Sequence, residues 1–253
     1  MLSALSLNDQ LALALGALGF LFLLINLLLR KRNNPPHIPE PSKEAVSHLL
    51  DASSEEGGRL IIGLGNSFTE SGFNLAGISG LGVQRALLKR SLFNDQPLQS
   101  YCGDGVLSCL SRMVVHGAYQ GALASELFSG SLSQLGGTSP LAYTVSLVNQ
   151  LSAYSNAGLL LTGLTSPMAL LAMDQADRNS IPTISAIASI SGQAAGFVGN
   201  TINLMGEDVF NAAGRLDQRK ASTASLSAQD WLRIVIGVGL LLGAILKMGG
   251  ILP

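Results

Sequence analysis

The sequence predicts an α/β fold with a mainly parallel, five-stranded, Rossmann-like sheet, helices on both faces, and flanking N- and C-terminal transmembrane helices. Short apolar runs that end at glycine alternate with helical patterns, as expected for a parallel sheet. The motif GGTSPLA at residues 136–142 returns as GLTSPMA at residues 163–169, and we call these the first and second repeats. Charged residues make up 12% of the chain, against roughly 25% in soluble proteins, which membrane segments and subunit contacts would explain in part.

A long apolar segment near the N-terminus, residues 11–29, predicts a membrane anchor. Its 19 residues carry no charge, and as a helix they would span about 28 Å, close to the roughly 30 Å hydrocarbon core of a bilayer. The basic residues 30–32 follow at once, so the positive-inside rule places the rest of the chain in the cytoplasm. A cleaved signal peptide is the alternative, but the apolar run is too long and its basic flank is on the wrong side.

The segment between the anchor and the α/β pattern is rich in proline. Residues 33–42 contain four prolines and predict an extended spacer, and residues 43–52 predict a short amphipathic helix. The predicted organisation is an anchor over 1–32, a Pro-rich linker with a short helix over 33–57, a cytosolic α/β domain over 58–216, a linker over 217–230, and a C-terminal transmembrane or membrane-associated helix over 231–253.

Five strands alternate with helical patterns in the α/β domain. The strands are expected at residues 59–64, 98–102, 131–135, 158–162 and 183–190. A capping-box pattern, Ser67 to Glu70, predicts that the first helix begins at Ser67 and runs to residue 90. Further helices are expected over 106–128, over 141–154, from the second repeat to about 179, and from 191 towards 214.

Two of the predicted segments each allow two interpretations. The first helix of the domain contains four of them, which predicts either a broken helix or a face packed closely against another backbone. In the C-terminal segment the uncharged core, residues 234–246, has only 13 residues, which favours a buried or re-entrant helix. It becomes long enough to span a bilayer if Arg233 and Lys247 snorkel. Trp231 suits a membrane interface, and Gly239 with Gly243 forms a Gly-x-x-x-Gly face.

The strand ends supply the candidate binding site, because ligands of open parallel sheets bind beyond the carboxyl ends of the strands, at helix N-termini. In both repeats a serine is expected to cap the following helix, with proline at the first helical position. One interpretation is that these residues only form caps and turns; the other is that their amides and hydroxyls hold a small anionic or polar ligand. The residues selected for the second interpretation are Gly65, Asn66, Ser67, Gly103, Asp104, Thr138, Ser139, Thr165, Ser166 and Ser191.

Known catalytic and nucleotide motifs are missing from the sequence. Gly63 and Gly65 begin a dinucleotide fingerprint, but its third glycine position is Phe68 and no acidic residue stands about 20 residues later. Three scattered histidines make no metal site, and no Gly-x-Ser-x-Gly elbow is present. The sequence therefore predicts no catalytic residues, no metal and no cofactor, and an enzyme that uses Asp104 is the minority hypothesis.

With these elements placed, residues 59–216 resemble a bacterial family of membrane-anchored proteins that share a domain of unknown function. The motifs that carry the resemblance are, in order, Gly63-Leu64-Gly65, Leu75-Ala76-Gly77, residues 100–105, Ser139-Pro140-Leu141-Ala142-Tyr143, and Gly206-Glu207-Asp208. The chain departs from the family at Gly105, where proline is usual, and in its compact second repeat. The resemblance implies an N-terminal anchor and an α/β domain, and no activity.

The leading functional hypothesis is a membrane-anchored, self-associating structural or accessory protein. The alternative is a membrane-tethered sensor or regulatory module that binds a ligand at the strand-end loops. The expected partners are the lipid bilayer, further copies of the chain and a larger membrane complex; the net charge of −1 argues against nucleic acid. The expected location is the inner (plasma) membrane, with the α/β domain facing the cytoplasm.

Overall fold

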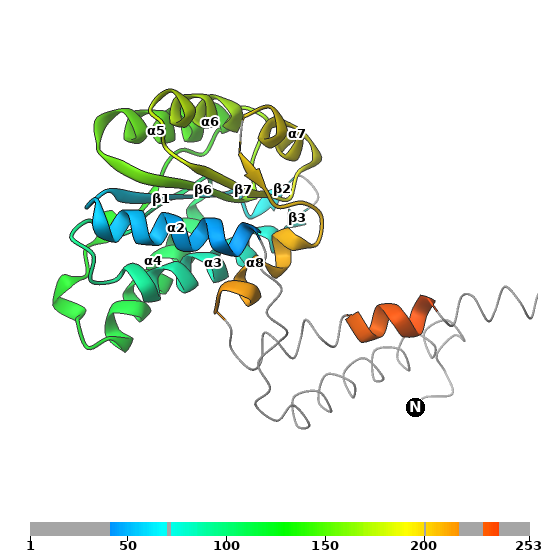
Figure 1. Ribbon diagram of the computed structural model, residues 1–253, viewed down its shortest axis with the longest axis horizontal. Helices are drawn as coiled ribbons and strands as arrows, with labels where there is room; N and C mark the ends of the chain where they lie inside the picture. Colours follow the sequence, from blue (N-terminus) through cyan, green and yellow to red (C-terminus); the bar gives the residue numbers. More distant parts are fainter. Residues whose placement is uncertain (1–40, 70–71, 200, 218–229, 238–253) are drawn as a thin grey trace, which may run out of the picture. The chain divides into compact units, whose positions relative to one another are not determined.

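The computed structural model describes residues 41–217, except 70–71 and 200, and residues 230–237 (Figure 1). The chain divides into two compact units, which are described separately: residues 38–217, and the two chain ends, 1–37 with 218–253. In the second unit the described residues 230–237 are helical, and Arg233 Nη1 lies 3.6 Å from Asp230 Oδ1. All further elements belong to the first unit.

A six-stranded sheet forms the centre of the first unit (Figure 1). Its strands are β1 (Arg59–Gly65), β4 (Gln99–Cys102), β5 (Ser133–Leu135), β6 (Asn156–Leu164), β7 (Thr183–Ile187) and β8 (Ile202–Asn203). They lie in the order β5-β4-β1-β6-β7-β8, and every neighbouring pair is parallel. Numbered along the chain, this is the 3-2-1-4-5-6 order of Rossmann folds. The α/β, Rossmann-like prediction is confirmed.

The predicted number of strands, five, was wrong. The sixth strand, β8, has only two residues and pairs with β7 through Ile184 with Ile202 and Ser185 with Asn203. Two residues give no alternating pattern, so the sequence predicted one helix from 191 towards 214. That stretch instead holds α7 (Ile190–Val198), β8 and α8 (Asp208–Asp217).

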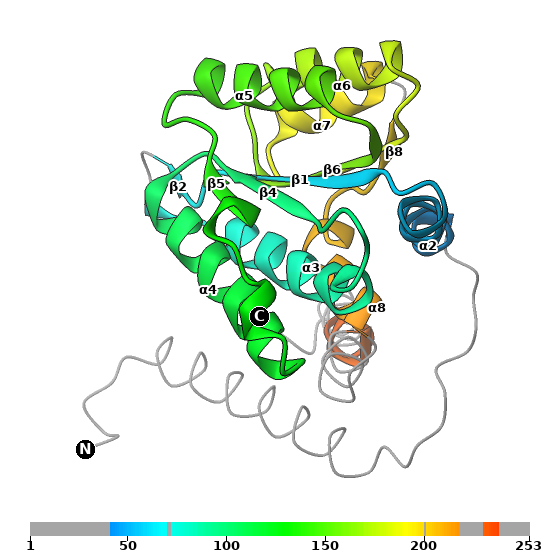
Figure 2. The same ribbon diagram turned by 90° about the vertical axis from the view of Figure 1, so that its left-hand side faces the viewer.

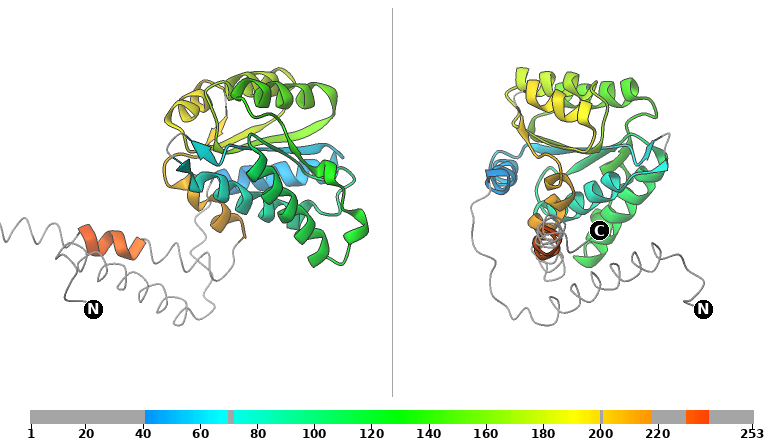
Figure 3. Two further views of the ribbon diagram at one scale, coloured as in Figure 1. Left: turned by 180° about the vertical axis from the view of Figure 1, so that it is seen from behind. Right: turned by 90° about the vertical axis from the view of Figure 1, so that its right-hand side faces the viewer.

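Two layers of helices cover the sheet (Figure 2). One layer holds α2 (Pro41–Glu55), α3 (Leu75–Ser91), α4 (Gly105–Gly121) and α8; the other holds α5 (Pro140–Ala153), α6 (Ala169–Arg178) and α7. Strand β1 serves both cores, because alternate side chains point to opposite faces of a strand. Ile62 and Leu64 belong to the α3 side, and Ile61 belongs to the α5 side. Figure 3 shows the same two layers from behind.

The first helix of the domain begins later than predicted. Ser67 is fully buried, and the residues after it form an antiparallel hairpin of β2 (Phe68–Thr69) and β3 (Gly72–Phe73). Helix α3 then begins at Leu75, with the Asn74 side chain accepting a hydrogen bond from Ala76 N at 2.8 Å. Glu70, the other half of the predicted capping box, lies outside the described residues.

The glycines of α3 are explained by close packing. Helix α3 is continuous, and a Cβ at Gly80 would stand 2.6 Å from Thr162 Oγ1 on β6. A Cβ at Gly82 would stand 2.7 Å from Ala213 Cβ on α8. Of the two alternatives left by the sequence, the closely packed face describes Gly77, Gly80 and Gly82, whereas Gly72 lies before the helix, in β3. Helix α4 ends at Gly121, before the predicted 128, and two short 3-10 turns follow, Ser125–Leu127 and Gly130–Leu132.

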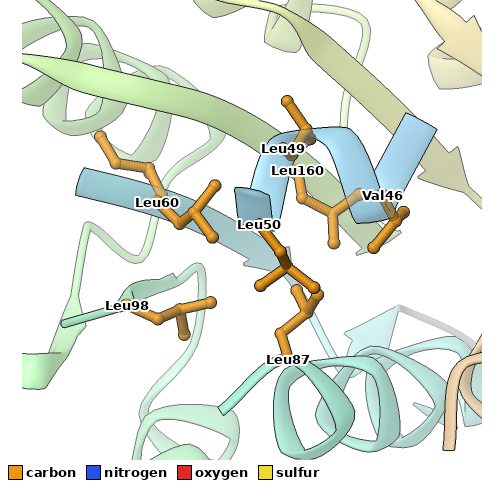
Figure 4. Close-up of a pocket in the computed structure, with 8 residues that line it drawn as sticks. Val46, Leu49, Leu50, Leu60, Leu87, Leu98 and Leu160 are labelled. Carbon is orange, nitrogen blue, oxygen red and sulfur yellow. The ribbon is translucent and has the colours of Figure 1, made fainter. Parts of the chain in front are cut away.

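Helix α2 packs into the core of the α/β unit, although it was assigned to the segment ahead of the domain. Val46, Leu49 and Leu50 are buried against β1 and α3. A cavity of about 10 Å³ remains between α2, the sheet and α3, lined almost wholly by leucines (Figure 4). A cavity of this size, with no polar lining, stays dry and is too small for a ligand.

Within the described residues, no helix combines the length and the apolar character that a membrane crossing requires. The predicted anchor at 11–29 and residues 238–253 of the C-terminal segment lie outside the described residues. Both spans therefore stay predictions.

Candidate functional site

The carboxyl ends of β1 and β6 form the topological switch point of the sheet. From β1 the chain continues to β4 on one side, whereas from β6 it continues to β7 on the other. In Rossmann-type sheets the ligand crevice lies at this point. The selected residues lie in the loops that follow the strands, except Gly65, which is the last residue of β1, and Ser191, which lies in the first turn of α7.

The loops after β1 and β4 are joined by hydrogen bonds. Gly103 N donates to Gly65 O at 2.7 Å. Ser67 donates to Asp104 Oδ2 from its backbone N at 2.5 Å and from its hydroxyl at 2.8 Å. The other oxygen, Oδ1, accepts from Leu107 N at 2.7 Å, so that Asp104 caps α4. Both carboxylate oxygens are thus engaged with the fold, which gives Asp104 a structural role and weakens the enzyme hypothesis.

The backbone also closes the space between β1 and β6. Asn66 N donates to Leu164 O at 2.8 Å, and Gly65 N donates to the Tyr143 hydroxyl at 3.1 Å. Gly65 has φ +60°, and a Cβ there would stand 2.4 Å from Leu164 O. A dinucleotide fingerprint needs a helix directly after β1, but α3 begins ten residues after Gly65, beyond the hairpin.

Tyr143 is a site residue that the sequence analysis quoted only for the resemblance. It lies in the first turns of α5, is buried, and reaches under β1, where a Cβ at Gly63 would stand 2.5 Å from its hydroxyl. Burial is the main cause that raises the pKa of Tyr143 far above its ordinary value, and the Gly65 N–H opposes this. The signal in the sequence was a tyrosine directly after the first repeat, where the second repeat is followed by leucine.

The first repeat behaves as the sequence predicted. Ser139 Oγ accepts from Ala142 N at 3.2 Å, and Pro140 is the first residue of α5. Gly136 N donates to Cys102 O at 2.9 Å, so the repeat is fastened to the end of β4. Thr138 and Ser139 are exposed at the entrance to α5.

The second repeat differs, so the predicted serine cap and proline start are wrong for it. Gly163 lies inside β6 with φ +82°, and α6 begins only at Ala169, without a side-chain cap. Ser166 Oγ accepts from Met168 N at 3.2 Å within the turn ahead of the helix.

Thr165, in the second repeat, carries an unusual hydroxyl. It is 4% exposed, and its Oγ1 is buried without a hydrogen-bond partner. Its carbonyl accepts from Ser189 Oγ at 2.5 Å, and Ser189 also caps α7 by accepting from Gly192 N at 3.1 Å. Ser189 is the second residue left out of the selected set. Ser191, selected in its place, is exposed on α7.

A buried polar cluster lies beneath the β4 and β5 ends. Gln84 Nε2 donates to the hydroxyls of Ser100 and Ser111 at 3.0 and 2.9 Å, and Ser133 donates to Ser111 at 2.7 Å. Beside them, burial raises the pKa of the Cys102 thiol to about 12. A thiol held neutral is a poor nucleophile, so Cys102 is not activated. The hydrogen bonds of the cluster join α3, β4, α4 and β5.

Comparison of the chain with protein-family models, with curated proteins and with solved structures gives no match. The site must therefore be interpreted from its own chemistry. In the part of the chain that the structure describes, no three His, Cys, Asp or Glu side chains gather as a metal site would require.

A second candidate surface follows from the distribution of charge. Residues 41–126, which form α2, α3 and α4, contain fourteen Asp, Glu, Lys and Arg residues, whereas residues 127–206 contain three. These three, Asp174, Asp177 and Arg178, all lie on α6, and Arg178 Nε is 2.8 Å from Asp174 Oδ2. We call the exposed residues of α5, α6 and α7 the charge-poor face. A count along the sequence would have found it.

Proposed function

We propose that this protein is a membrane-tethered, self-associating structural or accessory protein whose α/β domain binds protein surfaces. The observation that carries the proposal is the charge-poor face, on which exposed large apolar side chains such as Ile190 and Phe197 are accompanied by few charged ones. Surface patches of this kind mark interaction sites in soluble domains. Charged residues make up only 12% of the chain, and most of those in the domain lie away from this face.

The membrane part of the proposal rests on residues 11–29 and 231–253. The first segment has the length and the basic flank of an anchor, which supports a location at the inner membrane with the domain in the cytoplasm. The second is shorter in its uncharged core and contributes Trp231 and a Gly-x-x-x-Gly pair.

The strand-end loops support a structural role over a catalytic one. Asp104, Ser67, Gly65 and Gly103 are bonded to one another or to adjoining backbone. Groups that hold the loops in place are not free to transfer protons or to activate a nucleophile.

The size of the solubilised full-length chain tests self-association. Light scattering after size exclusion in mild detergent, corrected for bound detergent, should give a protein mass that is a multiple of 26.2 kDa. Alkaline carbonate extraction of membranes tests the tether, and the protein should stay in the pellet. A clean monomer would contradict self-association, and release into the supernatant would contradict the tether.

Thr165 favours a second candidate function, a ligand-binding regulatory module. A buried hydroxyl without a partner costs free energy, and a ligand at the switch point could satisfy it. Thermal-shift screening with nucleotides and phosphorylated metabolites tests this, since a ligand at 100 times its Kd adds about 2.7 kcal/mol. A true ligand should shift the wild type and not Thr165→Val; an absence of any shift across the panel removes the candidate.

A further inference from the structure

We propose that helix α8 is a releasable strap, which detaches from α3 in one piece while the rest of the α/β unit stays folded. Helix α8 is the last helix of this unit and lies beside α3, in the layer that also contains α2 (Figures 1 and 2). Helix α2 stands at the other end of the unit, and the two helices are held against it in different ways.

Few apolar side chains hold α8 in place. Of the α8 residues whose burial the structure describes, only Val209 and Ala212 are buried. Ala213 and Leu216 are partly buried against the core. Phe210, the one aromatic residue of the helix, is 48% exposed and adds little to the contact. Little apolar surface therefore leaves water when α8 docks.

The contact between α8 and α3 is made by small residues. A Cβ at Gly82 of α3 would stand 2.7 Å from Ala213 Cβ, so the two helices approach closely there. The Ser79 hydroxyl of α3 donates to Val209 O at 2.9 Å, with Phe210 O at 3.3 Å as a second acceptor. A gap of about 0.5–1 Å already forfeits a quarter to a half of the dispersion attraction between two atoms. A small displacement of α8 therefore removes most of this contact.

Helix α2, at the other end of the unit, is held by large side chains. Val46, Leu49 and Leu50 are buried in the core that α2 shares with α3. Helix α2 has 15 residues, whereas α8 has ten. An isolated helix shorter than about 12 residues is marginal in water, so α8 depends on its docking contacts. Segments with few buried apolar contacts open locally before the whole domain unfolds.

A glycine turn ahead of α8 separates it from the sheet. Leu204 N donates to Ser185 O at 2.7 Å, which holds the chain to β7 just before the turn. Gly206 then has φ +58°, and a Cβ there would meet no described atom within 4 Å. Release of α8 therefore requires no strand to separate from the sheet.

Release of α8 lengthens the connection between the α/β unit and the C-terminal segment. As a helix, its ten residues span about 15 Å, and as an extended chain they reach about 35 Å. A domain tethered through residues 231–253 would gain about 20 Å of reach. This consequence rests on the proposed membrane tether, whereas the opening of α8 does not, so either one can fail without the other.

Hydrogen exchange of the full-length chain in mild detergent, measured by mass spectrometry on overlapping peptides, tests the strap. The amides of residues 211–217 should exchange at least about a hundredfold faster than those of α3, at one common rate, because α8 opens in one piece. The amides of α2 should be as protected as those of α3. Equal protection of α8 and α3 overturns the proposal. A gradient in which only the last turn of α8 exchanges fast also overturns it, because that is fraying of a helix end.

Two matched glycine substitutions test whether docking on α3 controls the opening. Gly82→Leu places a Cβ against α8, whereas a Cβ at Gly117 on α4 meets no described atom within 4 Å. Both substitutions put the same helix former inside a helix. Gly82→Leu should speed the exchange of α8 roughly tenfold or more and leave α2 and α3 at least as protected as in the wild type. Gly117→Leu should leave α8 unchanged.

A smaller substitution keeps the test decisive if Gly82→Leu does not fold. Ser79→Ala removes the hydroxyl donor without adding volume, and it should speed the exchange of α8 about threefold or more. Unchanged exchange of α8 in the folded variants overturns the strap, because α8 would then not depend on its contact with α3. An equal gain of exchange in α3 also overturns it, because α8 would then open only with the whole domain.

Discussion

The first and second repeats differ at two of seven positions yet fold differently. In the first, the motif lies wholly beyond its strand, so Ser139 caps α5 and Pro140 begins it. In the second, the strand continues through Gly163 and Leu164, and the helix begins two residues later relative to the motif. The first repeat follows β5, an edge strand of the sheet, whereas the second follows β6, the strand at the switch point, which has β1 and β7 as neighbours on its two sides.

The difference teaches that the strand next to a motif decides how the motif is used. At β5, a three-residue edge strand, Gly136 makes a simple turn. At β6, a nine-residue central strand, the same position must pass close to β1, and Thr165 becomes buried where its counterpart Thr138 is exposed. Paired substitutions in the two repeats test this in order of decreasing effect.

The largest effect is expected at the first glycine of each repeat. Gly163→Ala places a Cβ 2.3 Å from Leu64 O at a residue with φ +82°, and should cost roughly 2–5 kcal/mol of unfolding free energy. In Gly136→Ala the nearest atom to the new Cβ is Tyr143 Cδ2, at 3.2 Å, and the substitution should cost about 1 kcal/mol or less. Urea unfolding followed by circular dichroism measures both. Equal losses would show that the two glycines are used alike.

The next effect concerns the residue that follows each repeat. Tyr143→Phe leaves Gly65 N without its acceptor and should cost about 1–3 kcal/mol. Leu170, at the equivalent position, gives a control: Leu170→Met should change stability by about 1 kcal/mol or less. A Tyr143→Phe variant as stable as the wild type would contradict the assigned bond.

The same variant predicts a pH dependence. Burial raises the pKa of Tyr143 in the folded protein, so above about pH 10 the unfolded chain loses this proton while the folded chain keeps it. Its contribution to stability is complete below pH 10 and is lost as the pH rises further, by up to about 1.4 kcal/mol per unit. Urea midpoints at pH 8 to 10.5 should fall more steeply for the wild type than for Tyr143→Phe; parallel curves would count against a buried phenol.

A smaller effect of opposite sign is expected for the threonines. Thr165→Val removes a buried hydroxyl that has no partner and should raise the unfolding free energy of the ligand-free protein by about 1 kcal/mol. Thr138→Val, at the exposed counterpart, should change it by less than about 0.5 kcal/mol. Destabilisation by Thr165→Val would mean that the hydroxyl is satisfied in solution.

The smallest difference in stability between paired substitutions is expected for the two serines. Ser139→Ala removes the cap of α5 and should cost about 1 kcal/mol. Ser166→Ala removes a bond within a turn and caps no helix, so a loss of a few tenths of a kcal/mol is expected. Thermal unfolding of the matched pair decides whether the two serines act alike.

The sequence was sufficient for the sheet architecture, because five of the six strands of the sheet lie beside glycine or proline and alternate with helical patterns. It was insufficient for β8, because this strand has only two residues. They pair with β7, and the Ser185 hydroxyl donates to Asn203 Oδ1 at 2.5 Å. The prediction of a helix start at Ser67 was wrong because the Ser67 hydroxyl donates to Asp104, a residue distant in the sequence, instead of capping a helix.

For the candidate site, the sequence located the loops and missed what joins them. Glycines and serines at strand ends can be recognised in the sequence alone, whereas the hydrogen bond from Gly65 N to the Tyr143 hydroxyl joins residues 78 positions apart. The charge-poor face was countable from the sequence, but only the fold shows that residues 127–206 place three helices side by side on one layer.

The central place of β1 has a consequence for synthesis. Its neighbour β4 begins about 30 residues later, but its other neighbour, β6, begins about 90 residues later. Because synthesis proceeds at roughly 5–20 residues per second, one edge of β1 stays unpaired for on the order of 5–20 s until β6 has been synthesised. An open strand edge is a template for pairing with another chain. Stalled or truncated nascent chains that stop short of residue 156 should therefore aggregate through β1, and those that pass residue 164 should not.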